Sequence, residues 1–297
     1  MNAAIRFAGV SRSFGTVQAL SAIDLEVGPG EMVGLVGPDG SGKTTLARLA
    51  AGALAPSTGR VEPEVRGRIG YLTGRYSLYP ELTVWENIRF FTRVYGMSPA
   101  EAAAEGQRLL EWVGLWPFKN RLSGQLSGGM RQKLALACAV VHRPPVLILD
   151  EPTTAVDPVA RQDFWNLLRS QADEGRAVLI TTPYMDEAEH CHRVGLLHQG
   201  RLLALDRPAA LKERLPWQMV LLTPAPGTSL NRMAAIRTAE GLPKQRWIQP
   251  QGTGVRVALE SGAPLAGPAG YTLTPVPPSL EDAYIWLSGA AGEVRVG

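Results

Sequence analysis

The chain has 297 residues, of which 45% are hydrophobic and 19% are charged. This length and composition fit a globular protein with one large domain and a smaller one, and they exclude a chain that is disordered throughout. A formal net charge of +3 with scattered arginines gives no special support to nucleic-acid binding, which usually leaves a concentrated basic patch in the sequence.

The cysteines and the apolar segments indicate the cellular compartment in which the protein resides. Cys138 and Cys191 lie far apart without CxxC spacing, which is typical of a reducing compartment. The start of the chain lacks the apolar core of a signal peptide, and no stretch approaches the roughly 18 apolar residues of a membrane helix. We expect a cytoplasmic protein, so any membrane pathway that it serves needs another chain to span the bilayer.

The first elements are predicted to be strands followed by a glycine-rich bend and a helix. Apolar and polar residues alternate over residues 5–7 and 23–27, which predicts half-buried antiparallel strands. The apolar run 32–36 predicts a buried strand, and helical spacing resumes over residues 44–53. This succession of strand, loop and helix is typical of a P-loop unit.

Helical periodicity dominates from about residue 76 to residue 143. One predicted helix there has four apolar residues on a shared face: Val84, Ile88, Phe91 and Val94. A second helix is expected to begin at Pro99 with Ser98 as its cap, and a further one runs from about residue 127 to residue 141.

The apolar runs 146–149 and 178–181 are typical of buried parallel strands. Together with the helices around them they predict an α/β fold with helices on both sides of a parallel sheet. We expect this larger domain to span residues 1–217, with a helical subdomain over about 76–143.

Proline and glycine become frequent toward the C-terminus, and short alternating runs appear at residues 218–222, 255–259 and 271–274. We predict a small α+β appendage over residues 218–297. Its last helix is expected to begin after Ser279, with Asp282 completing a variant of the capping box.

The glycine-rich bend fits GxxxxGK[ST] between a predicted strand and a predicted helix, which is the context of a phosphate-binding loop. Its residues are Gly37, Pro38, Asp39, Gly40, Ser41, Gly42, Lys43, Thr44 and Thr45. Glycines let the backbone wrap around phosphate, and the helix N-terminus favours the anion. Lys43 is expected to reach the β- and γ-phosphates of ATP, and the Thr44 hydroxyl to hold Mg²⁺.

The strand 146–149 delivers two acidic residues, Asp150 and Glu151, to the predicted mouth of that loop. Asp150 is expected to orient Mg²⁺ through its water shell. Glu151 is placed to polarise the attacking water as a general base, which needs reach to that water rather than contact with the metal.

The segment 126–132, LSGGMRQ, closely matches the LSGGQ signature of ABC proteins, and here the chain resembles a known family. In that family two cassettes pair head to tail, and each signature caps the ATP held by the other cassette. The resemblance assigns that role to Ser127, Gly128, Gly129 and Gln132. A hydroxyl and bare NH groups at a helix start suit a γ-phosphate. The implied fold is a P-loop NTPase of the ABC ATPase type, with a RecA-like core, an antiparallel β subdomain and a helical subdomain.

Three further features resemble the family. Phe14 matches the aromatic residue that stacks on adenine, although an aromatic residue in a strand more often belongs to the core. Residues 155–157 resemble the D-loop that crosses the dimer interface. Residues 78–87 resemble the segment where such ATPases dock onto the coupling helices of a permease.

Two positions depart from the family pattern. The glutamine expected after the strand 69–72 is replaced by Gly74, and the histidine expected after residue 182 is replaced by Pro183. Glycine has no side chain, and proline offers neither donor nor base. Because losing a group that stabilises transition-state charge commonly costs about 10² in rate, we expect this chain's own site to bind ATP and hydrolyse it slowly.

The whole chain looks most like the N-terminal half of fused two-cassette ATPases of bacterial ABC-2 type exporters. This resemblance implies an ATPase subunit of a multidrug exporter that lies peripherally on the inner face of the cell membrane. The implied partners are a second ABC cassette, as a hetero-pair or a fused half, and an ABC-2 type permease. The chain is then a fragment, a split subunit or a stand-alone relative.

Two other functions remain open at this point. One is a regulatory module that binds ATP without hydrolysing it, and the other is a soluble ribosome-associated ABC ATPase. The sequence does not indicate the transported substrate, because the permease determines substrate specificity.

Overall fold

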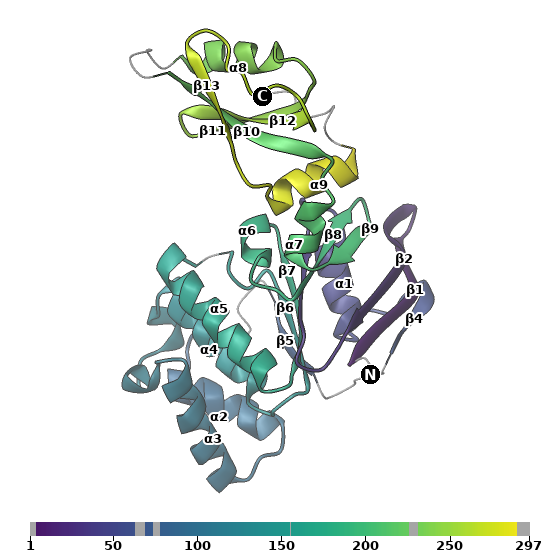
Figure 1. Ribbon diagram of the computed structural model, residues 1–297. Coiled ribbons are helices and arrows are strands. Elements are labelled where there is room, and N and C mark those ends of the chain that lie inside the picture. Colours follow the sequence, from purple (N-terminus) through teal and green to yellow (C-terminus); the bar gives the residue numbers. More distant parts are fainter. Residues whose placement is uncertain (1–3, 63–68, 74–77, 155, 226–230, 290–297) are drawn as a thin grey trace. The chain divides into compact units, whose positions relative to one another are not determined.

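The computed structural model in Figure 1 describes residues 4–62, 69–73, 78–154, 156–225 and 231–289. The chain forms two compact units, Met1–Leu205 and Asp206–Gly297. The division precedes the predicted boundary at residue 217, because helix α7 (Pro208–Glu213) packs against helix α9 (Leu280–Ser288) within the second unit.

An antiparallel sheet opens the first unit, as predicted. Its strand order is β2-β1-β4, with β1 at Ile5–Phe14, β2 at Val17–Val27 and β4 at Thr58–Glu62. Ile5 pairs with Val27 and Phe7 with Leu25, and all four side chains are buried. The alternation of apolar residues therefore marks the face that packs against the core.

A six-stranded sheet forms the centre of the first unit, in the order β5-β6-β7-β3-β8-β9. In that order the strands span Ile69–Leu72, Val146–Asp150, Ala177–Thr182, Met32–Val36, Arg193–His198 and Arg201–Asp206. The pairs from β5 through β8 are parallel, and every residue of β3, β6 and β7 is buried. Burial on both faces explains why these strands are continuous apolar runs.

Helices cover both faces of this sheet (Figure 1). Helix α1 (Lys43–Ala50) lies on the face toward β1 and β2, while α5 (Pro158–Asp173) and α6 (Met185–Ala188) pack on the other face. Alternate strand residues join the α1 side of the core: Val33, Leu35, Val146, Ile148, Ala177 and Leu179. This arrangement confirms the predicted α/β architecture.

The predicted helical subdomain contains α2 (Val84–Val94), α3 (Pro99–Trp112) and α4 (Gly128–Val140). Two 3-10 turns lie between α3 and α4, at Trp116–Phe118 and Ser123–Gln125. Capping boxes begin α2 and α3, each pairing a hydroxyl residue with a glutamate three residues on. The predicted start of α3 is confirmed.

The face predicted for α2 is partly wrong. Val84 and Ile88 are buried, but Val94 at the end of the helix is 61% exposed. Asn87 and Thr92 take buried positions because their side chains bond to backbone carbonyl groups within and before the helix.

Within the described residues, the second unit contains a four-stranded antiparallel sheet and two helices besides α7. The strand order is β11-β12-β10-β13. The strands span Gln245–Gln251, Gly254–Glu260, Trp217–Pro224 and Tyr271–Pro275 in that order, and the helices are α8 (Arg232–Glu240) and α9. The start of α9 after Ser279, with Asp282 in its capping box, is confirmed. β11 and α8 were not predicted, because their sequences are mainly polar or small.

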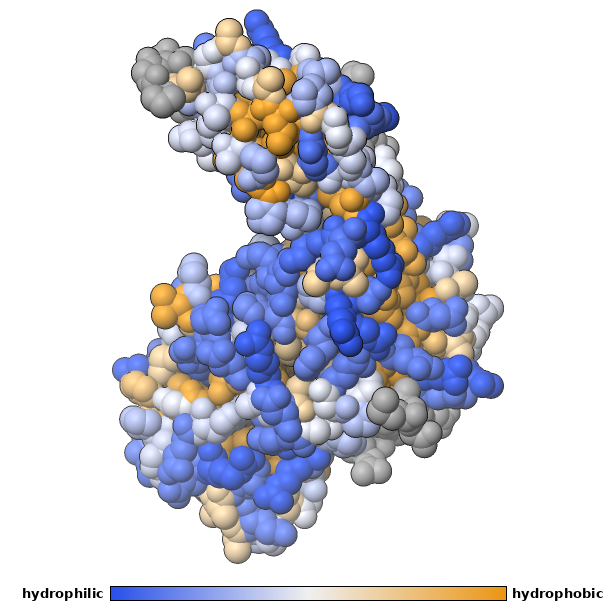
Figure 2. Space-filling view, viewed as in Figure 1, coloured by the Kyte–Doolittle hydropathy of each residue, from blue (hydrophilic) through white to orange (hydrophobic). Residues whose placement is uncertain are grey.

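In the part of the chain that the structure describes, no helix combines the length and the apolar character needed to cross a bilayer. Hydrophilic residues predominate on the visible face of the first unit, with smaller apolar groups among them (Figure 2).

A buried ion pair fixes α9 on the sheet of the second unit. Arg256 on β12 donates from Nε to Oδ1 of Asp282 at 3.0 Å and from an NH₂ group to Oδ2 at 2.5 Å. The Asp282 side chain is 1% exposed, and it also accepts the Ser279 amide at 2.7 Å. One carboxylate therefore satisfies both the buried guanidinium and the start of the helix.

Asp282→Ala is expected to lower the free energy of unfolding of the second unit by about 3 kcal/mol, because it leaves a buried arginine without its counter-charge. Chemical denaturation followed by tryptophan fluorescence measures the change. The neighbouring Glu281→Ala is the control, because its side chain bonds Gln249 at an exposed site and should cost about 0.5 kcal/mol or less. Equal losses in the two variants would contradict the role of the ion pair.

Candidate functional site

The predicted phosphate-binding loop connects the end of β3 to the start of α1. Gly40 and Gly42 have φ angles of 77° and 106°, a region that residues with a Cβ atom rarely adopt. At Gly37 an added Cβ atom would lie 2.1 Å from the carbonyl oxygen of Leu197. The glycines are therefore required by backbone conformation at two positions and by close packing at the third.

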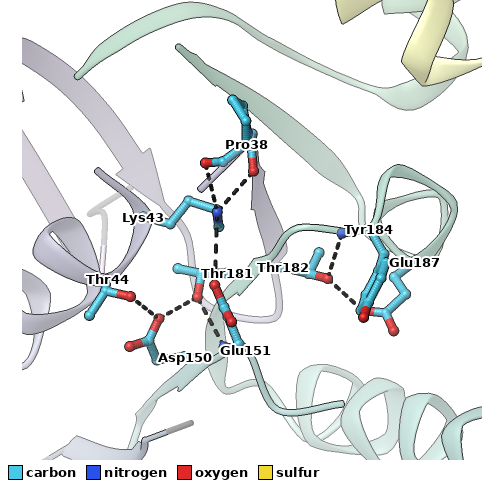
Figure 3. A network of polar contacts seen from close by, with 10 residues as sticks. Pro38, Lys43, Thr44, Asp150, Glu151, Thr181, Thr182, Tyr184 and Glu187 are labelled. Atoms are coloured by element: carbon cyan, nitrogen blue, oxygen red, sulfur yellow. Dashed lines mark hydrogen bonds and ion pairs between the residues drawn. The ribbon is translucent and has the colours of Figure 1, made fainter. Parts of the chain in front are cut away.

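Lys43 lies across this loop. Its side chain is 3% exposed, and Nζ donates to the carbonyl oxygens of Gly37 at 2.8 Å and Pro38 at 3.1 Å (Figure 3). The same Nζ lies 3.8 Å from Oε1 of Glu151. The ammonium group is thus held at the loop and beside the acidic pair.

Ser41 adds a second polar group to the loop. Its hydroxyl oxygen is buried, and within the described parts of the chain it has no hydrogen-bond partner. A buried hydroxyl without a partner costs free energy, and a bound phosphate would satisfy it. Together with Lys43, this hydroxyl shows that the residues present fit a phosphate group.

Asp150 lies at the carboxyl end of β6 and is 6% exposed. Its Oδ1 accepts a hydrogen bond from the Thr44 hydroxyl at 3.2 Å (Figure 3). A carboxylate and a hydroxyl are oxygen ligands of the kind that Mg²⁺ prefers, so Thr44 and Asp150 fit the magnesium role predicted for them. Burial raises the pKa of the nearby Tyr71 hydroxyl, and the charge of Asp150 raises it further.

Glu151 has an unusual backbone conformation, with a φ angle of 49°. Its amide donates to the carbonyl oxygen of Thr181 at 3.0 Å and to the Thr181 hydroxyl at 3.1 Å. Residues in this region are strained, and they cluster at functional sites where the surroundings hold them. The turn directs the Glu151 carboxylate toward Lys43 (Figure 3).

Phe14 at the end of β1 has an exposed ring. The residue is 46% exposed, and the guanidinium carbon of Arg12 lies 4.6 Å from the ring centroid. Phe14 is thus not a core residue, and the guanidinium of Arg12 lies over one face of its ring.

The predicted signature residues begin helix α4, as expected. Ser127 is exposed and caps the helix, and its hydroxyl accepts the Met130 amide at 3.3 Å. Gly129 also has a packing role, because an added Cβ atom would lie 2.7 Å from Cβ of Ala160 on α5. Gln132 is only 5% exposed, so it presents little surface to a nucleotide held by another cassette.

The structure describes only one of the two positions that depart from the family pattern. Gly74 lies outside the described residues, and so does Ala155 of the predicted D-loop. Pro183 directly follows β7 and is half-buried. The backbone around it is held by Thr182, whose hydroxyl accepts the Tyr184 amide at 3.1 Å.

Glu187 is a buried carboxylate that was not among the residues predicted from the sequence. It connects the segment around Pro183 to the loop that follows Asp150 and Glu151. Glu187 is 2% exposed and accepts hydrogen bonds from the hydroxyls of Thr153 at 2.7 Å and Thr182 at 2.6 Å. Nε of Arg161 lies 3.3 Å from its Oε1. Thr153 and Arg161 come from two other parts of the chain, so the sequence around Glu187 gives no sign of these contacts.

Comparisons with known proteins identify the family. A family model described as ABC transporter matches residues 20–154. The Nod factor export ATP-binding protein I of Rhizobium sp. strain N33 is 36% identical over 301 residues, which cover 96% of this chain and 97% of that protein. The chain belongs to the ABC transporter ATP-binding proteins. Another member is the probable multidrug ABC transporter ATP-binding protein YbhF of Escherichia coli strain K12, 36% identical over 303 residues.

The alignment with YbhF covers 97% of this chain and 51% of YbhF, so the chain spans about half the length of that relative. Solved structures of ABC cassettes share its fold. An ATP-binding subunit of an ABC transporter matches with a TM-score of 0.64 and 28% identity, covering 71% of this chain and 92% of that one. The dimeric structure of MJ0796, a bacterial ABC transporter cassette, matches with a TM-score of 0.63 and 26% identity, covering 68% and 98%. The predicted ABC ATPase fold is confirmed.

Gly37→Ala is expected to weaken ATP binding by about tenfold or more, because the added methyl group must push the loop away from Leu197. Titration with a fluorescent ATP analogue measures the affinity. Gly28→Ala is the matched control, because its Cβ atom would meet its nearest neighbour at an ordinary 3.5 Å. Unchanged affinity in the Gly37 variant would show that the loop tolerates the shift.

Proposed function

We propose that this chain is the ATP-binding subunit of an ABC exporter and powers a separate membrane permease. In this proposal ATP closes the cassette against a second cassette, and the closure drives the permease. The observation that carries the proposal is the meeting of Lys43, Thr44, Asp150 and Glu151 at one loop. The names of its relatives support export, since YbhF is called a probable multidrug transporter component and the rhizobial protein a Nod factor export protein.

The signature supports pairing with a second cassette. Ser127 is exposed at the start of α4, where its hydroxyl and the first amides of the helix are positioned to meet an anion. A related cassette has been solved as a dimer. The partner in this proposal is a different cassette or a fused half, with complete switch residues of its own.

The site of this chain is proposed to bind Mg²⁺ and ATP and to hydrolyse ATP slowly. Pro183 has no group that can donate to a γ-phosphate, and Gly74 has no side chain to contact Mg²⁺ or water. Glu151 remains available as a base, with Lys43 beside it. The loss of charge-stabilising groups lowers the rate without removing the binding loop.

The helical subdomain is proposed to dock onto an ABC-2 type permease, which places the protein on the inner face of the cell membrane. Large side chains near the start of this subdomain support docking, since Tyr79 is 44% exposed and Phe90 is 37% exposed. Their rings lie edge to face with centroids 4.6 Å apart. Exposed aromatic clusters of this kind are typical of protein interfaces.

A second candidate function is favoured by Pro183. If the site does not hydrolyse ATP at all, the cassette is a regulatory module that holds ATP and supplies only Ser127 to Gly129 to the partner's reaction.

The purified chain is expected to bind Mg²⁺-ATP while turning it over about 10² times more slowly than a cassette with complete switch residues. Lys43→Ala should weaken binding by about tenfold or more, because it removes an ammonium group from the phosphate site. Calorimetric titration and a phosphate-release assay measure the two quantities, with Lys212→Ala as a control outside the loop. Rapid turnover that Glu151→Gln abolishes would refute the slow site.

In a complex of this chain with its partner cassette and permease, Ser127→Arg should abolish most ATP hydrolysis, because it blocks the signature that completes the partner's site. Glu151→Gln in this chain should change the rate little. Steady-state ATPase activity of the reconstituted complex measures both. The opposite ranking would place hydrolysis in this chain's own site, and copurification with ribosomes instead of a permease would overturn the exporter function.

A further inference from the structure

Thr181 lies at the predicted ATP site but was not among the residues predicted from the sequence. It belongs to the buried strand β7 and is 0% exposed. In the parallel pairing of β6 with β7 it is the register partner of Asp150. Its side chain therefore lies beside the acidic pair in the interior of the sheet (Figure 3).

The Thr181 hydroxyl contacts both acidic residues. It donates to Oδ1 of Asp150 at 2.6 Å and accepts the amide of Glu151 at 3.1 Å. The first bond has the length of a hydrogen bond to a charged carboxylate, which is among the stronger kinds. One hydroxyl thus connects the side chain of one acid to the backbone of the other.

The bond to Asp150 fixes the direction of its carboxylate. The hydroxyls of Thr44 and Thr181 both reach Oδ1, so neither of these bonds occupies Oδ2. The Thr181 bond is the shorter of the two, at 2.6 Å against 3.2 Å. Since Thr181 is held in the middle of the sheet, its bond keeps Oδ2 in one orientation.

The bond from Glu151 supports a strained turn. With a φ angle of 49°, Glu151 needs its surroundings to hold the conformation that directs its carboxylate toward Lys43. Both the carbonyl oxygen and the hydroxyl of Thr181 accept the Glu151 amide. The side chain of Thr181 therefore adds a second acceptor for the Glu151 amide beside the backbone carbonyl oxygen of Thr181.

The next residue shows that these contacts are specific to position 181. Successive residues of a strand point to opposite faces, and the hydroxyl of Thr182 donates to Glu187 at 2.6 Å instead. Two adjacent threonines thus serve different networks.

We propose that Thr181 is a positioning residue for the magnesium–ATP site, whose hydroxyl orients Asp150 for Mg²⁺ and holds the turn at Glu151. This inference rests on the proposed function, because it requires that the loop binds ATP with Mg²⁺. Thr44 and Asp150 would hold Mg²⁺, Asp150 through its water shell, and the bond from Thr181 would set the direction of the Asp150 carboxylate.

Thr181→Val keeps the shape of the side chain and removes the hydroxyl. In calorimetric titrations of the full chain, this variant should bind ATP with Mg²⁺ about tenfold more weakly than the parent. Binding of ATP in EDTA should stay within about twofold, because the phosphate loop itself is untouched. Thr181→Ser should restore most of the Mg²⁺-dependent affinity. Thr92→Val is the matched control, since it removes an equally buried hydroxyl in α2 and should change neither affinity.

Mg²⁺-ATP affinity in Thr181→Val equal to that of the parent would overturn the inference, and so would an equal loss with and without Mg²⁺. If the parent chain binds no Mg²⁺-ATP, the proposed function fails first. Should Thr181→Val not fold, Thr181→Cys makes the same comparison with a weak S–H donor, and an affinity at the parent level would again count against the role of the hydroxyl.

Discussion

The parallel register of three buried strands is the constraint on which the site depends. β3 pairs with β7 so that Val36 lies beside Thr182, and β7 pairs with β6 so that Thr181 lies beside Asp150. The carboxyl ends of the three strands therefore meet at one edge of the sheet. Each strand leads into one part of the site: β3 into the phosphate loop, β6 into the acidic pair and β7 into the segment of Pro183. Each part is therefore held in place by a buried strand.

The site combines opposite charges with a strained backbone. Lys43 lies between the loop carbonyls and Glu151, and Asp150 accepts two hydroxyl groups on one oxygen. A lysine and carboxylates held in a partly dry site interact more strongly than they would in water. Glu151 keeps its conformation because its amide is bonded twice to Thr181. These contacts organise the groups before a nucleotide arrives.

The segment around Pro183 keeps its support although the family histidine is absent. Glu187 joins Thr182 to Thr153, which follows the acidic pair, and to Arg161 on α5. A buried carboxylate with this many donors is costly to disturb, because any lost partner leaves a charge unsatisfied. The contacts of Glu187 therefore hold the backbone on both sides of Pro183, although proline itself brings no side-chain donor.

The sequence by itself determined the α/β core, the antiparallel opening sheet and the phosphate loop, because glycine spacing and apolar periodicity are local properties of the chain. It also located Ser98 and Ser279 as helix caps, since capping depends on residues three positions apart. The partners of Glu187, the role of Thr181 and the burial of Gln132 depended on the tertiary structure. Each of these is set by contacts with segments distant in the sequence, and strand register and helix packing bring those segments together in ways that local pattern does not encode.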